Sequence, residues 1–277
     1  MRIGVVYERM RPEERQIISA IKELGHEPVP YHLNSSPLPF NGKLDFEVAI
    51  IRAISSIRAQ VTASLLESSG VRTVNASQVL SVCGNKVITT AKLIEAGVPT
   101  PKTALAFNLE GALKAAETLG YPVVVKPING SWGRLVSLAQ DEEELRTIIE
   151  HREAIPSPYY RVHYIQEFVK KPGRDIRVYA TEEGVIAAIY RISEHWITNT
   201  ARGGRAEPAE ITEELEEISI KTVKAVGGGF LGIDVVESDE GLMVLEVNGV
   251  TEFKNASRVT GVDIAREMVE YALGVIR

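Results

Sequence analysis

Three oxygen-bearing side chains lie on two apolar segments that are typical of β-strands. Asp234 belongs to GIDVVE, and Glu246 and Asn248 belong to LEVN. Glu246 and Asn248 are separated by one residue, so they share one face of a strand. The intervening SDEG predicts a hairpin turn that places Asp234 opposite Glu246. Such hard oxygen ligands suit Mg²⁺, whereas the alternative is the polar outer face of an ordinary hairpin.

Two lysines and a loop of small residues suggest a place for phosphate. Lys126 ends the apolar strand PVVVK, and Lys86 begins a helix after CGN. The loop INGSWGR follows Lys126, where the backbone N–H groups of Gly130, Ser131 and Gly133 can hold phosphate oxygens. The loop does not follow the G-x-x-x-x-G-K-[ST] pattern. A solvated lysine at a strand end remains the alternative.

A strand end and a group of arginines add polar chemistry. In YIQEFV, Glu167 can accept a hydrogen bond from an exocyclic amine while the next backbone groups meet a purine edge, or it is simply a solvated acid. Guanidinium groups bind phosphate and carboxylate through two parallel hydrogen bonds, although a rim of surface charges is the alternative. The arginines between residues 174 and 205 are Arg174, Arg177, Arg191, Arg202 and Arg205.

The composition excludes several classes of protein. The chain has 277 residues, 44% of them hydrophobic, and a formal charge of −6, which fits a globular protein and argues against a dedicated nucleic-acid binder. The single Cys83 excludes an internal disulfide framework and a zinc site built from thiolates. No apolar run approaches the roughly 18 residues of a membrane span, and the N-terminus is too charged for a signal peptide. We therefore expect a cytoplasmic protein without a membrane partner.

Strands and helices alternate in the first part of the chain, which predicts a parallel α/β unit. The expected strands are 2–7, 46–52 and 71–75, and the expected helices are 12–24 and 57–69. After residue 85 we expect helices at 86–97, 109–119, 141–151, 212–226 and 262–273. The strands expected there are 103–107, 121–127, 135–139, 162–168, 174–180, 184–192, 229–237 and 241–248.

The order of these motifs resembles that of the ATP-grasp superfamily and, within it, the RimK-like carboxylate–amine ligases. KPINGSWGRL, YIQEFVKKPGRDIRV, HWITNTARGG and VNGVTEFKN look like the LysX group, and the resemblance extends over essentially the whole chain. It implies an α/β ATP-grasp fold in three parts. These are a parallel pre-ATP-grasp domain (1–84), a central α+β subdomain (85–166) and a C-terminal subdomain (167–277) with an antiparallel sheet and the metal site.

The resemblance also assigns roles to residues. Asp234, Glu246 and Asn248 would hold Mg²⁺, with two ions expected, and Arg191, Asn199 and Arg202 would face the reacting phosphates. The ATP-binding set is Lys86, Lys126, Gly130, Ser131, Trp132, Gly133, Arg134, Gln166, Glu167, Phe168, Val169 and Asp175. The substrate-binding set is Arg177, Gly249, Val250, Thr251, Glu252, Phe253, Lys254 and Asn255.

Members of the LysX group attach 2-aminoadipate, or in the ArgX relatives glutamate, to a small acidic carrier protein, LysW, in lysine or arginine and ornithine biosynthesis. The tripeptide at 249–251 differs from the common one, so both acceptors stay open. A glutamate ligase acting on another protein or peptide, and an ATP-binding regulator without catalysis, are the alternatives. A homo-oligomer, either a dimer or a tetramer, is expected. The basic residues considered for carrier docking are Arg152, Arg161, Lys170 and Lys171.

Overall fold

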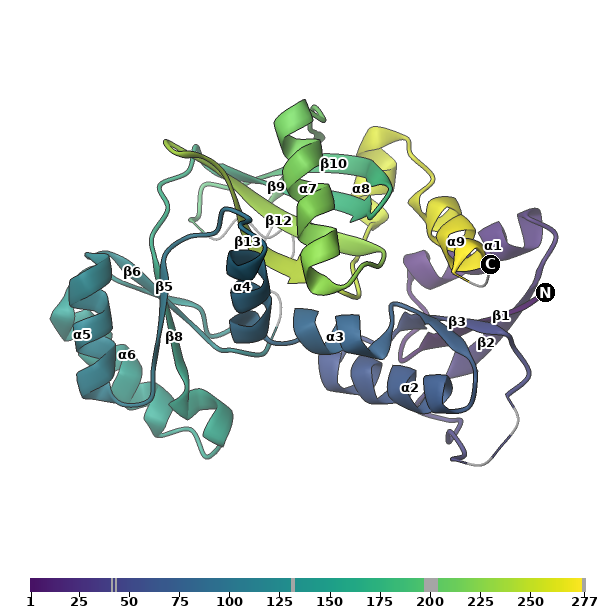
Figure 1. Cartoon of the computed structure of the whole chain (residues 1–277), viewed down its shortest axis with the longest axis horizontal. Coiled ribbons are helices and arrows are strands. Elements are labelled where there is room, and N and C mark those ends of the chain that lie inside the picture. The colour runs from purple at the N-terminus through teal and green to yellow at the C-terminus, as the bar shows by residue number, and fades with distance from the viewer. Residues whose placement is uncertain (41, 43, 131–132, 197–203, 276–277) are drawn as a thin grey trace.

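The computed structural model describes residues 1–40, 42, 44–130, 133–196 and 204–275. Three sheets follow one another along the long axis of the molecule, and the two termini lie at the same end (Figure 1). The fold class predicted from the sequence is confirmed, because a parallel N-terminal sheet is followed by two antiparallel ones. Within the described residues, no helix combines the length and the apolar character that crossing a membrane requires.

The N-terminal sheet has the strand order β2-β1-β3-β4 and is parallel throughout. Strand β2 was not predicted, because Pro28 and Pro30 interrupt its apolar pattern; it is an edge strand, where a missing N–H is tolerated. Helix α3 was also not predicted. The elements are β1 (Arg2–Tyr7), α1 (Pro12–Glu23), β2 (Glu27–His32), β3 (Val48–Arg52), α2 (Ser56–Ser68), β4 (Arg72–Val74) and α3 (Ser77–Cys83).

The central part forms an antiparallel sheet of order β5-β8-β6-β7. Helices α5 and α6 pack against it around a core that is separate from the other cores. Helix α4 instead lies beside α7, over the C-terminal sheet (Figure 1). The elements are α4 (Lys86–Glu95), β5 (Thr103–Ala106), α5 (Leu109–Leu119), β6 (Val123–Lys126), β7 (Ser137–Ala139), α6 (Glu142–Glu153), a 3₁₀ turn (Pro158–Arg161) and β8 (His163–Glu167).

The C-terminal sheet has the order β11-β10-β9-β12-β13, and its last two strands form the predicted hairpin. Strand β11 and helix α8 are further elements that the sequence did not predict. The elements are β9 (Arg174–Thr181), β10 (Gly184–Ile192), β11 (Arg205–Pro208), α7 (Glu213–Val226), β12 (Leu231–Ser238), β13 (Gly241–Asn248), α8 (Lys254–Thr260) and α9 (Ile264–Gly274).

The chain returns at its end to the N-terminal domain, where α9 packs against α1 (Figure 1). One apolar core consequently runs through both parts. Ile3 and Ile17 of the N-terminal domain belong to the same cluster as Tyr179 of the C-terminal sheet and Met268 of α9. The N-terminal domain and the C-terminal sheet are therefore packed as one unit.

An ion cluster is buried where these two parts meet. Glu14 on α1 has no exposed surface, and Arg52 at the end of β3 is 1% exposed. Glu14 Oε1 lies 3.1 Å from Arg52 Nε and 2.8 Å from Arg11 Nη2. Burial alone would raise the pKa of Glu14, but its hydrogen bond with Arg11 and the charge of Arg52 outweigh that effect and lower the pKa.

The cluster predicts a large loss of stability on removal of its carboxylate. Glu14→Ala leaves the Arg52 guanidinium buried without its counter-charge, so the free energy of unfolding should fall by about 3–5 kcal/mol. Glu23→Ala is the matched control, because Glu23 is exposed on the same helix; its effect should stay within about 0.5 kcal/mol. Urea unfolding measures both, and equal effects of the two variants would contradict the prediction.

Candidate active site

A cleft lies between the central sheet and the C-terminal sheet, with about 860 Å³ of empty space that includes the open solvent at its mouth. Its walls come from the ends of β6 and β8, from the N-terminus of α4 and from strands of the C-terminal sheet. The structure thus brings together residues that the sequence separates by up to 160 positions. The predicted site residues that line the cleft are Lys86, Lys126, Gly130, Gly133, Arg134, Gln166, Glu167, Phe168, Val169, Asp175, Arg191, Asp234 and Glu246.

A β-bulge places the two carboxylates of the hairpin side by side. Asp234 pairs with Glu246, as predicted from the turn. The turn is one residue shorter than expected, since Ser238 pairs with Gly241 and not with Leu242. The register then shifts between Val235 and Asp234, where the bulge leaves Leu245 without a partner on β12. Without this extra residue Asp234 would face Leu245, and Glu246 would point to the other face of the sheet.

Two arginines surround the carboxylate of Asp234, which is buried. Arg177 reaches both of its oxygens, through Nε and through Nη2 at 3.1 Å, and Arg191 Nη2 lies 3.1 Å from Oδ2. Arg191 also binds Asp175, with Nε 2.6 Å from Oδ1 and Nη2 2.9 Å from Oδ2. Burial alone would raise the pKa of Asp234, but Arg177 and Arg191 outweigh burial and hold that pKa below its usual value.

The hairpin offers donors of the type that Mg²⁺ prefers. Asp234 and Glu246 supply carboxylate oxygens and Asn248 an amide oxygen. A carboxylate has about four lone-pair sites, and three N–H groups of Arg177 and Arg191 approach that of Asp234, which leaves one for a cation. Within the described residues no group of three His, Cys, Asp or Glu side chains forms a metal site. A site here therefore needs the amide of Asn248 or phosphate oxygens as further ligands.

The two lysines converge on the cleft from different elements. Asn85 caps α4 by accepting from the N–H groups of residues 87 and 88, which sets Lys86 in the first turn. Lys86 Nζ lies 3.0 Å from Glu246 Oε1 and donates to the carbonyl oxygen of Gly130 at 3.0 Å. Lys126 Nζ donates to Gln166 Oε1. Burial lowers the pKa of Lys126 to about 8, although Glu246 opposes this shift.

The end of β8 forms the wall expected to hold adenine. The Gln166 side chain is 1% exposed, and its Nε2 donates to Thr103 Oγ1 and Tyr164 Oη. Glu167 Oε1 accepts from the backbone N–H of Lys102 at 2.7 Å. The side chains of Gln166 and Glu167 are therefore already hydrogen-bonded within the protein, and residues 166–169 line the cleft.

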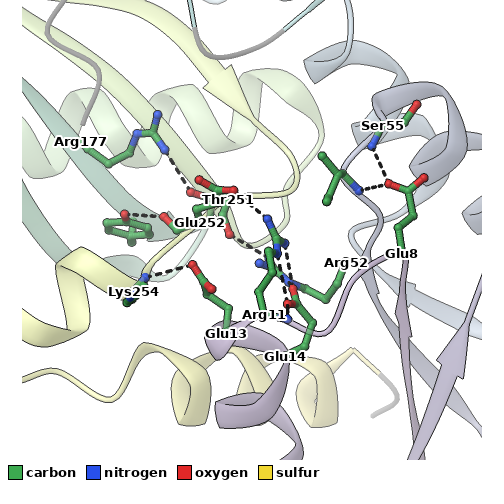
Figure 2. Close-up of polar contacts among 12 residues, drawn as sticks. Glu8, Arg11, Glu13, Glu14, Arg52, Ser55, Arg177, Thr251, Glu252 and Lys254 are labelled. Carbon is green, nitrogen blue, oxygen red and sulfur yellow. Dashed lines mark hydrogen bonds and ion pairs between the residues drawn. The ribbon is translucent and has the colours of Figure 1, made fainter. Parts of the chain in front are cut away.

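Residues 249–254 run from the end of β13 to the first residue of α8, and we call them the acceptor loop after the role expected of them from the sequence. Gly249 and Val250 line a second cavity of about 490 Å³, which shares Glu246 and Gly130 with the cleft and also contacts Asn248. Polar contacts hold the rest of the loop against the N-terminal domain and the sheet (Figure 2). Phe253 is fully buried, and Lys254 and Asn255 begin α8.

Several residues that the sequence assigned to the site do not line the cleft or lie outside the described residues. Ser131, Trp132, Asn199 and Arg202 lie outside the described residues. Arg177 stands behind Asp234 and does not line the cleft. The expectation that Arg152 docks a carrier is wrong, because its side chain is buried and donates to the carbonyl oxygen of Lys126.

Lys171 and Trp196 are among the cleft residues that were not assigned to the site from the sequence. Lys171, considered only for carrier docking, lies 3.5 Å from Asp175 Oδ2 inside the cleft. Trp196 lines the cleft with its ring edge-on to Phe168, at a centroid distance of 6.1 Å. The spacing of Lys171 from Asp175, four residues along one segment, was the available signal for the first. From the sequence alone, Trp196 could be either a core residue or a wall of the cleft.

Comparison with known proteins identifies the two parts of the chain. The family model for the RimK-like ATP-grasp domain matches residues 83–272, and the model for the LysX preATP-grasp domain matches residues 3–82. Among solved structures, the RimK domain protein ATP-grasp from Sphaerobacter thermophilus superimposes with a TM-score of 0.85 at 26% identity, covering 99% of this chain and 100% of that one.

Two relatives from Sulfurisphaera tokodaii match nearly the whole chain. One, named alpha-aminoadipate–LysW ligase LysX, is 41% identical over 97% of this chain and 97% of its own length. The other, named glutamate–LysW ligase ArgX, is 40% identical over 98% of both chains. These matches confirm the resemblance that the motifs predicted: the chain belongs to the RimK-like ATP-grasp family and carries a LysX-type pre-ATP-grasp domain.

Proposed function

We propose that this protein is an ATP-dependent ligase that joins the α-amine of 2-aminoadipate, and of glutamate as a second acceptor, to a LysW-like carrier protein. The bond forms at the side-chain carboxylate of the carrier's C-terminal glutamate. The observation that carries the proposal is the cleft in which Lys86 and Lys126 face Asp234 and Glu246. The similarity to two LysW ligases at about 40% identity supports the choice of carrier and acceptors.

In the proposed reaction the carrier carboxylate attacks the γ-phosphorus of ATP, and the bond to the β-phosphate oxygen breaks. Lys86 and Lys126 neutralise charge on the transferring phosphoryl group. The Gly130 and Gly133 backbone covers the phosphates, and the main chain of residues 166–169 holds adenine. Phe168 and Trp196 form an apolar wall that limits the access of water.

The product of this step is an acyl phosphate on the carrier. The acceptor α-amine attacks its carbonyl carbon, an oxyanion forms, and phosphate leaves. Arg191, together with Asn199 and Arg202, is proposed to stabilise this charge, and such a preorganised donor is worth about 3–4 kcal/mol of the barrier. Arg177 and residues 249–255 are proposed to position the acceptor.

The residues of the hairpin fit Mg²⁺, and we propose that Asp234, Glu246 and Asn248 hold two ions. Bound Mg²⁺ supplies charge stabilisation for phosphoryl transfer. The carrier is acidic, so its docking requires local positive charge, for which Arg161 and Lys170 are exposed candidates. We further propose a cytoplasmic homo-oligomer, a dimer or a tetramer.

Removal of either carboxylate charge should stop the reaction. Asp234→Asn and Glu246→Gln are expected to lower kcat by at least about 10²–10³-fold, because both side chains would hold the metal–nucleotide complex. Phosphate release on addition of carrier and amino acid measures this. Glu237→Gln is the control, since Glu237 lies on β12 with Asp234 but forms an ion pair with Arg174 and does not line the cleft. A variant at 234 or 246 that kept most of its activity would remove that residue from the metal site.

ATP affinity should depend on pH through Lys126. Its pKa is lowered to about 8 by burial, so the ammonium that attracts phosphate is lost as pH rises through about 8. The Kd for Mg-ATP should then increase by up to about tenfold per pH unit above that value, whereas below it the Kd should be constant. Lys126→Arg keeps its charge and should abolish the dependence. Calorimetric titration tests this, and an unchanged Kd up to about pH 9.5 would contradict it.

The two acceptors should differ only moderately. Because 2-aminoadipate and glutamate differ by one methylene, a pocket distinguishes them by about 1–3 kcal/mol, or 10–200-fold in kcat/KM. Competition between the two on the same carrier measures this ratio. A ratio beyond roughly a thousandfold would rule out dual use.

A further inference from the structure

The acceptor loop is held from both sides by polar groups that belong to different parts of the fold (Figure 2). From the N-terminal domain, Arg52 Nη1 donates to the Thr251 carbonyl oxygen at 2.8 Å, and Arg11 Nη1 donates to Glu252 Oε1 at 2.7 Å. Glu13 Oε1 accepts from the backbone N–H of Lys254 at 3.4 Å. The loop is therefore attached to the pre-ATP-grasp domain at residues 251, 252 and 254.

The C-terminal sheet holds the same loop from the opposite side. Arg177 Nη1 donates to Thr251 Oγ1 at 3.3 Å, and Tyr179 Oη donates to the Glu252 carbonyl oxygen at 2.8 Å. Gly232 on β12 makes room for Thr251: a Cβ on this glycine would lie 2.3 Å from Thr251 Oγ1 and 2.8 Å from Thr251 Cβ. Thr251 is thus pressed against the strand two residues before Asp234.

These contacts form a continuous path between the N-terminal domain and the proposed metal site. Glu14 binds Arg52, which binds Thr251 through its carbonyl oxygen. Arg177 binds the hydroxyl of the same residue and both carboxylate oxygens of Asp234. A planar guanidinium can serve two acceptors at once, which a lysine ammonium cannot do with the same geometry.

We propose that Arg52, although it lies in the pre-ATP-grasp domain, is a positioning residue of the ligase reaction. It fixes the acceptor loop, through Thr251 and Arg177, relative to Asp234, which is proposed to hold the metal. The inference rests on the proposed function and adds to it a specific role for the N-terminal domain. The role concerns only the second step, in which the acceptor amine attacks the acyl phosphate.

Hydroxylamine separates the two steps. This small nucleophile needs no acceptor loop: its nitrogen forms a bond to the acyl carbon of the carrier, the bond to phosphate breaks, and a hydroxamate results. In Arg52→Met, kcat/KM for the amino acid should fall by roughly 10- to 100-fold because the loop is displaced, while ATP-dependent hydroxamate formation stays within about threefold of the wild type. The KM for ATP should be unchanged.

Three further variants complete the experiment. Arg52→Lys keeps a positive charge beside Glu14, so this variant should fold even if Arg52→Met does not. It should lower amino-acid ligation selectively, because one ammonium cannot reach both Glu14 and the Thr251 carbonyl oxygen. Gly232→Ala displaces Thr251 from the sheet side and should give the same selective loss. Arg58→Met is the control, because Arg58 is an exposed arginine of the same domain that binds Glu8 and Asn34 instead; both of its rates should match the wild type.

The outcomes are distinct. A selective loss of amino-acid ligation in the Arg52 and Gly232 variants supports the inference. Equal losses of ligation and hydroxamate formation, or no loss in folded Arg52→Lys, overturn it. Failure of the wild-type protein to form hydroxamate from carrier, ATP and hydroxylamine would instead overturn the proposed function.

Discussion

Two carboxylates that lie side by side in a partly enclosed cleft repel each other. Most of the charged side chains around them are cations that compensate this repulsion. Asp234 and Glu246 are cross-strand neighbours. Arg177 and Arg191 surround the first, and Lys86 lies against the second. Like charges directly opposite each other would otherwise destabilise the hairpin. The same balance that stabilises the fold also lowers the pKa of Asp234.

The balance also explains why the cleft suits a polyanion. Lys126 is half-buried and donates to Gln166, and desolvation lowers its pKa to about 8. A desolvated ammonium has lost part of its hydration energy. A negatively charged phosphate replaces that lost hydration and therefore stabilises the charged form strongly. In the proposed function, the cost of desolvating this ammonium in the free protein becomes a preference for nucleotide phosphates.

The sequence predicted which residues come together at the cleft better than it predicted their geometry. The pairing of Asp234 with Glu246 followed from the turn, but it is correct only because the bulge at Leu245 compensates for a turn that is one residue tighter than expected. A bulge leaves no signal in alternating hydrophobicity, and neither do long-range partners such as Arg52 and Thr251. Strand β2 and helix α8 were missed because prolines and tertiary packing override local propensity there.

The distribution of cores suggests that the two half-reactions are served by different parts of the molecule. The core of the central sheet is separate, whereas one core joins the N-terminal sheet, the C-terminal sheet and α9. The nucleotide cleft lies across the boundary between the separate part and the joined part, so its width depends on how the central sheet is placed. The acceptor loop lies wholly within the joined part, between Arg52 and Arg177. In the proposed reaction, the cleft can therefore close around ATP while the contacts of Arg52 and Arg177 with the loop are kept.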